Sequence, residues 1–234
     1  MAITNTTAEK MPMIEFLADF IPHYLPQLLK GAIVTIELSI VSMVCSVLVG
    51  VVCAVGALSG VRMATIPVKI YVEVCRGVPL IVILLTIFFI LPRAGISLPA
   101  FWAAVVGLSF NLGAYLSEVF RAAILAVDPG QKQAGLSLGM GRLLVFRKII
   151  LPQAAVIAMP TVGGYFISLL KDCSLAFFVT VEELMQQGRY VISATFRTEE
   201  TYFLVGLIYF AMSFVAARLI QAMELHLRPK YLRV

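Results

Sequence analysis

The stretch that decides the fold is GAIVTIELSIVSMVCSVLVGVVCAVGAL, residues 31–58, in which Glu37 is the single charged residue. A helix needs about 20 apolar residues to cross the hydrocarbon core of a bilayer, and this run is longer. Over the whole chain of 234 residues, 61% are hydrophobic and only 13% are charged, whereas soluble domains contain about 25% charged residues. The sequence therefore predicts an integral membrane protein without room for a separate soluble catalytic domain.

Four further apolar runs predict four more spans, at about residues 71–91, 101–127, 154–170 and 202–223. Residues 11–30 contain Glu15, Asp19, His23 and three prolines, so they are too polar to span and predict an interfacial segment. We therefore expect an all-α membrane protein with five transmembrane helices. It divides into an external or interfacial segment, residues 1–30, and a membrane domain, residues 31–234.

The orientation follows from the distribution of positive charge. With five spans the two termini lie on opposite sides, and twelve of the 18 Lys and Arg residues fall on the side of the C-terminus. Because Lys and Arg accumulate in cytoplasmic loops, we expect the C-terminus in the cytoplasm and the N-terminus outside.

The longest polar connection is DPGQKQAGLSLGMGRLLVFRKIILP, residues 128–152, which we call the knuckle. Asp128 and Pro129 form a helix start, with Gln131 as a capping acceptor, and the glycines of Gly139-Met140-Gly141 form a break. A second short helix should run from Arg142 to Ile150 and end before Pro152. Two short helices that meet at a glycine bend would project from the cytoplasmic side.

The knuckle resembles the EAA loop of ABC importer membrane subunits. The matching residues, in the family's spacing, are Gln133-Ala134-Gly135, Gly139 and Ile149-Ile150-Leu151-Pro152. Two residues differ from the family pattern: Gln133 stands where Glu is usual, and Gly135 stands where the second Ala is usual. Residues 71–80, 114–121 and 170–175 are also similar to the polar amino-acid permeases of the histidine/glutamine type, and the resemblance extends over the chain from about residue 26.

This resemblance implies the permease subunit of a type I ATP-driven importer for a polar L-amino acid, in the bacterial cytoplasmic (inner) membrane. In that family the knuckle is the coupling helix, which docks on a cytoplasmic ABC ATPase dimer. A second permease subunit, identical or different, completes the pathway, and an extracytoplasmic substrate-binding protein delivers the amino acid. The residues expected to couple to the ATPase are Gln133, Ala134, Gly135, Ser137, Leu138, Gly139, Met140 and Phe146.

The resemblance also implies that ATP and Mg bind the partner, so we expect this chain to have no enzyme activity, cofactor or metal site. The motifs agree: the chain has no Walker lysine loop, GxSxG or HExxH. Its four cysteines form no CxxC pair and are expected to be structural thiols. Nucleic acid is not an expected partner, because the positive charge is explained by the membrane.

Polar groups within the spans are candidates for the translocation pathway, because charged side chains in hydrocarbon cost at least about 2.5 kcal/mol and face the protein interior. They are Arg76, Asn111, Tyr115, Glu118, Lys171 and Asp172. Each has a structural alternative. Glu118 could pair with Arg121 three residues later, Arg76 could extend to the interface beside the break at Gly77-Val78-Pro79, and Lys171-Asp172 could form an interfacial pair.

Two other functions stay open. A secondary transporter could use Glu118 or Lys171-Asp172 as a proton relay, although such transporters usually have two related halves and the chain has no internal repeat. A non-transporting assembly subunit would only hold a partner in place.

Overall fold

The structure is a computed structural model that describes residues 19–231, with side chains as far as His226. The part of the predicted interfacial segment at residues 1–18 lies outside the described residues. The described residues form helices and short connections, without strands. The α-helices are α2 (Ile21–Leu58), α3 (Arg62–Gly77), α4 (Leu80–Leu85), α5 (Ala100–Leu125), α6 (Pro129–Ser137), α7 (Arg142–Val145), α8 (Leu151–Asp172), α9 (Leu184–Thr195) and α10 (Thr198–Tyr231). Shorter turns are η2 (Thr86–Ile90) and η4 (Phe146–Ile150), which are π-helical, and η3 (Leu91–Ala94) and η5 (Cys173–Val179), which are 3₁₀.

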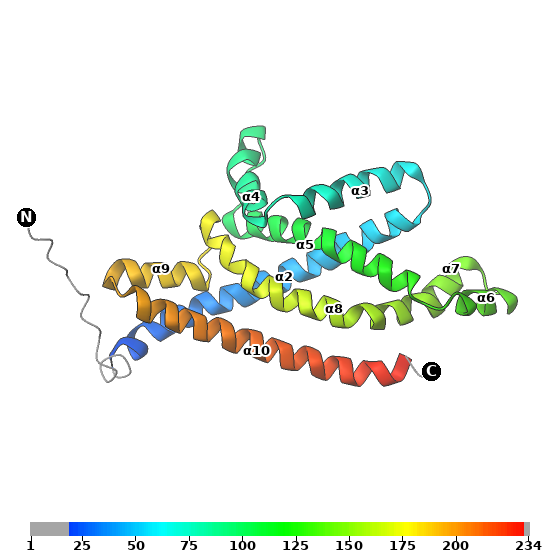
Figure 1. The fold of residues 1–234 in the computed structure, drawn as a ribbon. Coiled ribbons are helices and arrows are strands. Elements are labelled where there is room, and N and C mark those ends of the chain that lie inside the picture. Colours follow the sequence, from blue (N-terminus) through cyan, green and yellow to red (C-terminus); the bar gives the residue numbers. More distant parts are fainter. Residues whose placement is uncertain (1–18, 232–234) are drawn as a thin grey trace, which may run out of the picture.

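Four helical segments of the described chain are long and apolar enough to cross a membrane: Ile21–Leu58, Ala100–Leu125, Arg142–Val179 and Thr198–His226. Arg62–Gly77 and Leu80–Ala94 make a fifth if this pair, bent by 108°, is one span. The axes of the four long helices α2, α5, α8 and α10 are roughly aligned, with α8 running opposite to the other three, and α4 stands across them (Figure 1). The predicted all-α fold with five spans is confirmed, whereas the orientation remains a prediction.

The tightest packing in the fold joins α2 to α5. The buried face of α2 is a stripe of small residues: Gly31, Thr35, Ser39, Ser42, Ser46, Gly50 and Ala54. A Cβ on Gly50 would lie 2.9 Å from the Leu116 Cβ, and one on Gly113 would lie 2.7 Å from the Val49 Cγ1. Because small residues let helix backbones approach closely, this stripe gives van der Waals contact where no hydrophobic effect acts between helices.

The first span is longer than the sequence predicted. Helix α2 begins at Ile21 rather than near Gly31, so residues 21–30 are continuous with the helix of the first span. Their interfacial position stays a prediction. Packing explains the extension: Leu28 is fully buried in a cluster with Leu184 of α9 and Leu204 of α10. Tertiary contacts therefore outweigh the polar residues and prolines of this stretch.

The second span is broken at the predicted proline and is not a straight helix over 71–91. Helix α3 ends at Gly77, Val78 is extended with φ −101° and ψ 131°, and α4 begins after Pro79. Proline lacks the N–H that would continue the helix, and it forces the preceding residue out of the helical region.

One other expectation was wrong. The knuckle's second helix does not end before Pro152, because α7, η4 and α8 form one continuous helical segment from Arg142. The π-helical turn η4 immediately before Pro152 shifts the backbone hydrogen bonding, which lets the helix continue past a residue without an N–H. The connection between α8 and α10 contains a further helix, α9.

The α2–α5 contact can be tested with one methyl group. We expect Gly50→Ala to destabilise the fold by about 1 to 3 kcal/mol, because the new Cβ overlaps the α5 backbone and Leu116. Gly206→Ala is the matched control, since a Cβ there meets nothing within 4 Å and gains only the helix propensity of Ala. The measurement is the thermal unfolding midpoint of each purified variant in detergent. Equal midpoints for both variants would contradict this packing.

Candidate functional site

A cavity of about 420 Å³ lies where the α3–α4 break meets α5 and α8. Four of the six predicted pathway residues line it, namely Arg76, Asn111, Tyr115 and Asp172, together with Tyr165 and Ser168 of α8. Tyr165, Ser168 and Asp172 are spaced i, i+3 and i+7, so they share one face of α8. Tyr165 and Ser168 were missed in the sequence, although this spacing with Asp172 was a signal for them.

Asn111 holds the break in place. Its Nδ2 donates to the Cys75 carbonyl at 2.9 Å, and this is the carbonyl that the missing N–H of Pro79 leaves without its usual helical donor. The Tyr71 hydroxyl ties α3 to α5 a second time, donating to the Phe110 carbonyl at 2.6 Å. The amide of Asn111 is therefore engaged with backbone, which favours a positioning role over direct substrate contact.

Two opposite charges of the cavity have no ionic partner within the described side chains. The Arg76 guanidinium lies 5.4 Å from the centre of the Tyr115 ring, a cation–π distance. Asp172 ends α8, and the two ion pairs in this part of the chain involve other residues. The cavity therefore offers one cation and one anion, and the rings of Tyr115 from α5 and Tyr165 from α8 lie 5.9 Å apart in its lining.

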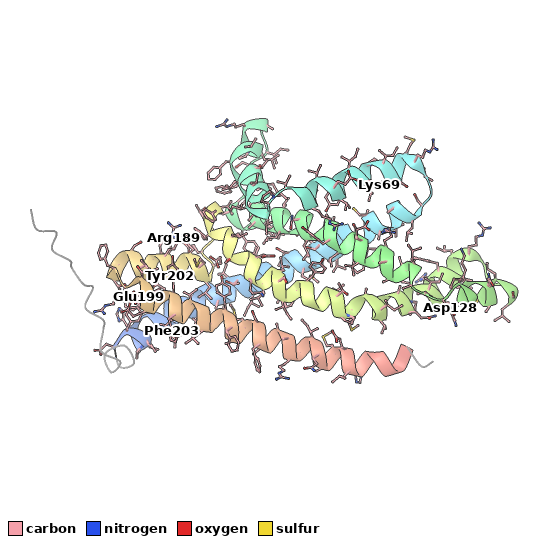
Figure 2. All side chains as sticks on the ribbon, in the orientation of Figure 1. Lys69, Asp128, Arg189, Glu199, Tyr202 and Phe203 are labelled. Carbon is pink, nitrogen blue, oxygen red and sulfur yellow. The ribbon has the colours of Figure 1, made fainter. Side chains whose placement is uncertain are left out.

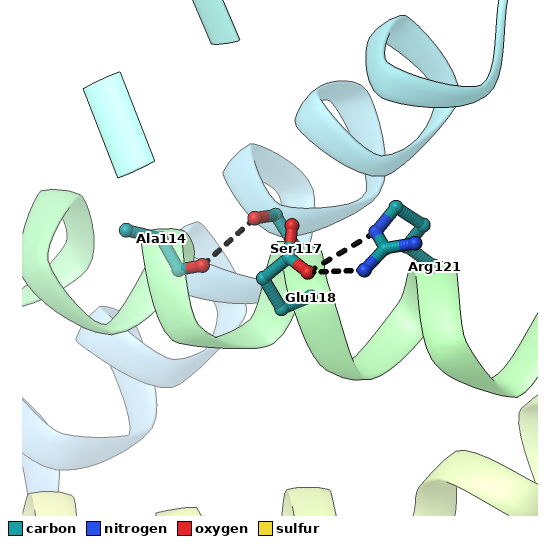
Figure 3. Close-up of polar contacts among 4 residues, drawn as sticks. All are labelled: Ala114, Ser117, Glu118 and Arg121. Atoms are coloured by element: carbon teal, nitrogen blue, oxygen red, sulfur yellow. Dashed lines mark hydrogen bonds and ion pairs between the residues drawn. The ribbon is translucent and has the colours of Figure 1, made fainter. Parts of the chain in front are cut away.

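Glu118 does not line this cavity. Its carboxylate accepts from Arg121, at 2.6 Å from Nη2 and 3.1 Å from Nε, in the pairing that was the structural alternative (Figure 3). Both residues line a second cavity of about 560 Å³ with Lys69 and Glu73. Arg76 lines both cavities and so lies between them. Lys171 is exposed and lines neither.

The knuckle has the predicted helix start and break. The Asp128 carboxylate accepts from the Gly130 N–H at 2.6 Å and caps α6. At the other end, Gly139 has φ 79°, while its N–H bonds to the Leu136 carbonyl and the Met140 N–H bonds to the Gly135 carbonyl. This pattern is a Schellman motif, in which glycine takes the left-handed position.

The side chains of the knuckle separate into two groups. Leu138 and Leu143 are 82% and 78% exposed. The other exposed residues of the predicted coupling set are Gln133, Ala134, Ser137 and Gly139, and Met140 is half-buried. Gly135 is instead buried within the knuckle, where a Cβ would lie 2.9 Å from both Ile149 and Val145 side-chain atoms. Phe146 is half-buried and lines a separate cavity.

Residues 46–229 match the family model described as the binding-protein-dependent transport system inner membrane component. The chain belongs to this family. It is thus a permease component of an ABC transporter, and its recognition from the knuckle is confirmed.

The relatives of this permease are similar along most of their length. It is 37% identical to the probable amino-acid ABC transporter permease protein YckA of Bacillus subtilis (strain 168), over 82% of this chain and 85% of that protein. It is 32% identical to the glutamine transport system permease protein GlnP of Escherichia coli (strain K12), over 86% and 92%. A crystal structure of an amino acid ABC transporter with histidines superposes with a TM-score of 0.84 at 34% identity, covering 92% of this chain and all of the other.

The permease also holds a buried carboxylate that the sequence did not reveal. Glu183, fully buried, caps α9 by accepting from the N–H groups of Met185 and Gln186, both at 2.9 Å. The Tyr209 hydroxyl of α10 donates to it at 2.8 Å, and the Thr35 hydroxyl of α2 at 3.5 Å. One side chain thus joins three helices. Helix α9, which carries the labelled Arg189, lies at the end of the molecule opposite the labelled Asp128 (Figure 2).

The Glu183 cluster predicts a pH dependence of stability. Burial raises the pKa of Glu183 from 4.5 to about 7, against four hydrogen bonds that lower it. Between these values the folded state holds more protons than the unfolded state, so this group makes the folded state less stable as pH rises from about 4.5 to 7. Glu183→Gln removes the titration and should flatten the dependence of the thermal unfolding midpoint on pH.

Glu182→Gln, at the exposed neighbouring carboxylate, should keep the slope of the unaltered permease. Identical slopes for Glu183→Gln and the unaltered permease would contradict the titration of this carboxyl group.

Proposed function

We propose that this permease is the translocating subunit of an ATP-driven importer for a polar L-amino acid in the bacterial cytoplasmic membrane. The names of its relatives, which include a glutamine permease and a probable amino-acid permease, support the substrate class. The cavity supports it by its chemistry. Arg76 is suited to the α-carboxylate because a guanidinium forks onto a carboxylate, and Asp172 is suited to the α-ammonium group.

One observation carries the coupling mechanism: the same two helices connect the knuckle to the cavity. Helix α5 contributes Asn111 and Tyr115 to the cavity and ends at Leu125, three residues before the cap Asp128. On the other side of the knuckle, the continuous segment Arg142–Val179 carries the α8 wall of the cavity. A force on the knuckle is therefore transmitted along two helices to both sides of the cavity.

The proposed cycle uses these connections. A cytoplasmic ATPase dimer, which binds ATP and Mg, docks on the exposed residues of the knuckle, and this chain hydrolyses nothing itself. ATP binding draws the knuckles of two permease subunits together and opens the cavity to the outside, where a substrate-binding protein delivers the amino acid. Hydrolysis returns the pair to the inward-open state. Arg76, between the two cavities, is placed to pass the substrate carboxylate from one to the other.

A proton-relay transporter is the weaker alternative. One of its two candidates, Glu118, is already engaged by two guanidinium nitrogens of Arg121, and the other, Lys171-Asp172, has only Asp172 in the cavity.

Reconstitution tests the proposal directly. The permease is placed in proteoliposomes with its ATPase and substrate-binding protein, and uptake of radiolabelled glutamine and other polar amino acids is measured. We expect uptake that requires ATP and the binding protein and survives collapse of the proton gradient. Uptake that continues without ATP would contradict the proposal.

The charges of the cavity should matter for transport and not for assembly. We expect Arg76→Gln and Asp172→Asn each to lower uptake at least about tenfold, because each removes one ionic contact to the substrate. The ATPase should still co-purify with both variants. Arg93→Gln and Glu182→Gln are controls with the same charge changes at exposed positions outside the cavity. Normal uptake by both cavity variants would show that the substrate does not use these charges.

Docking of the ATPase should depend on the backbone at Gly139. Gly139→Ala puts a side chain in a left-handed conformation, which costs about 1 to 2 kcal/mol and should weaken ATPase binding five- to thirtyfold or reshape the bend. Gly141→Ala is the matched control, because Gly141 has an ordinary φ of −65° and equally open surroundings. The measurement is the affinity of the ATPase for each detergent-purified variant. Equal affinities for the Gly139→Ala and Gly141→Ala variants would contradict docking through this bend.

A further inference from the structure

A cavity of about 310 Å³ lies between the knuckle and the ends of two spanning helices. Leu58, the last residue of α2, and Ile124, near the end of α5, form its side toward the membrane. The knuckle supplies the rest: Lys132, Leu136, Arg142, Val145, Phe146 and Ile150. The cavity is therefore apolar apart from two cations, and it opens where the spans leave the bilayer.

The two cations lack a counter-charge. Neither Lys132 nor Arg142 forms an ion pair with any described side chain, and no carboxylate lines the cavity. The nearest acidic residue along the chain, Asp128, is engaged with the Gly130 N–H as the cap of α6. Both cations are exposed, so they can reach an anion at the membrane surface.

Of the eight residues expected to couple to the ATPase, Phe146 lines the cavity and the other seven do not. The exposed leucines of the bend, Leu138 and Leu143, do not line it. A ligand can therefore stay in the cavity while a protein covers the bend.

We propose that this cavity binds an anionic phospholipid. Its phosphate lies between Lys132 and Arg142, and the adjoining acyl chain packs against Leu58, Ile124 and Phe146. Basic pockets at the ends of transmembrane helices recognise anionic headgroups, and each basic side chain adds to the attraction. Such a lipid fills the space under the knuckle and links its position to the membrane. The inference goes beyond the proposed function. With the knuckle in the cytoplasm, as that function requires, the lipid belongs to the cytoplasmic leaflet.

The test is lipid retention by the full-length chain. The purified permease in mild detergent is mixed with equal amounts of phosphatidylglycerol and phosphatidylcholine carrying the same acyl chains, and bound lipid is identified by native mass spectrometry. We expect phosphatidylglycerol to be retained in roughly tenfold preference. The double variant Lys132→Gln with Arg142→Gln should retain both lipids about equally.

Two further variants keep the result interpretable. Arg147→Gln with Lys148→Gln removes the same charge from exposed knuckle residues that do not line the cavity, and it should keep the preference. Lys132→Arg with Arg142→Lys should keep it as well, which separates loss of charge from loss of fold.

Three results would overturn the proposal: equal retention of the two lipids by the unaltered chain, equal loss of preference in the Arg147 and Lys148 variant, or displacement of the lipid by millimolar inorganic phosphate. The last result would indicate a site for free phosphate. Retention requires neither ATP nor transport, so its outcome is independent of the importer assay.

Discussion

A backbone carbonyl within a membrane protein needs a hydrogen-bond donor, because the bilayer core has no water to supply one. The break at Val78 and Pro79 removes such a donor from Cys75, and the side chain of Asn111 replaces it at 2.9 Å. This contact joins the broken second span to α5 and permits the bend of 108° that opens the cavity. Arg76, one turn before the break, thereby lies over Tyr115 at the junction of two cavities.

Polar groups elsewhere in the bundle are also paired between helices. Helix α5 lies against the small-residue face of α2, where Ser109 donates to the Ser42 carbonyl at 3.2 Å. The Glu183 carboxylate accepts hydrogen bonds from N–H groups at the start of α9, which have no earlier helical turn to pair with. It also accepts from the Thr35 hydroxyl of α2 and the Tyr209 hydroxyl of α10. The contact between α2 and α5 is the most extensive in the described fold, and α8 packs against α5 over a smaller area.

Hydrophobicity alone predicted the spans, because length and apolarity are local properties of the chain. Capping chemistry predicted the start of α6, and glycine predicted its end, for the same reason. The extension of α2 back to Ile21 and the continuation past Pro152 depend on tertiary packing and a π-helical turn, so local rules predicted them wrongly. Glu183 was hidden because a polar stretch with two adjacent glutamates is typical of an exposed loop; only the folded chain brings Thr35 and Tyr209 to it.

For the candidate site, polar groups within apolar spans led to four residues that line one cavity, and their role in a translocation pathway stays a prediction. Sequence spacing could not decide whether Glu118 forms an ion pair or lines the pathway, because Arg121 at i+3 is compatible with both. Gly135 shows the opposite case: the family resemblance places it in the coupling loop, while its buried contacts with Val145 and Ile149 make it part of the knuckle's own packing.

The central claim, that the knuckle is a cytoplasmic contact for an ATPase, is tested most directly by chemical accessibility at Leu138. A Leu138→Cys variant in native membranes is treated with a membrane-impermeant thiol reagent from each side, and with a thiol-to-amine cross-linker in inside-out vesicles. Phe196→Cys, at the 89% exposed residue after α9, serves as the marker of the outer side. The account predicts labelling of Leu138→Cys from the inside only and a cross-link to the ATPase subunit. Labelling from the outside, or no cross-linked partner in vesicles that still transport, would contradict it.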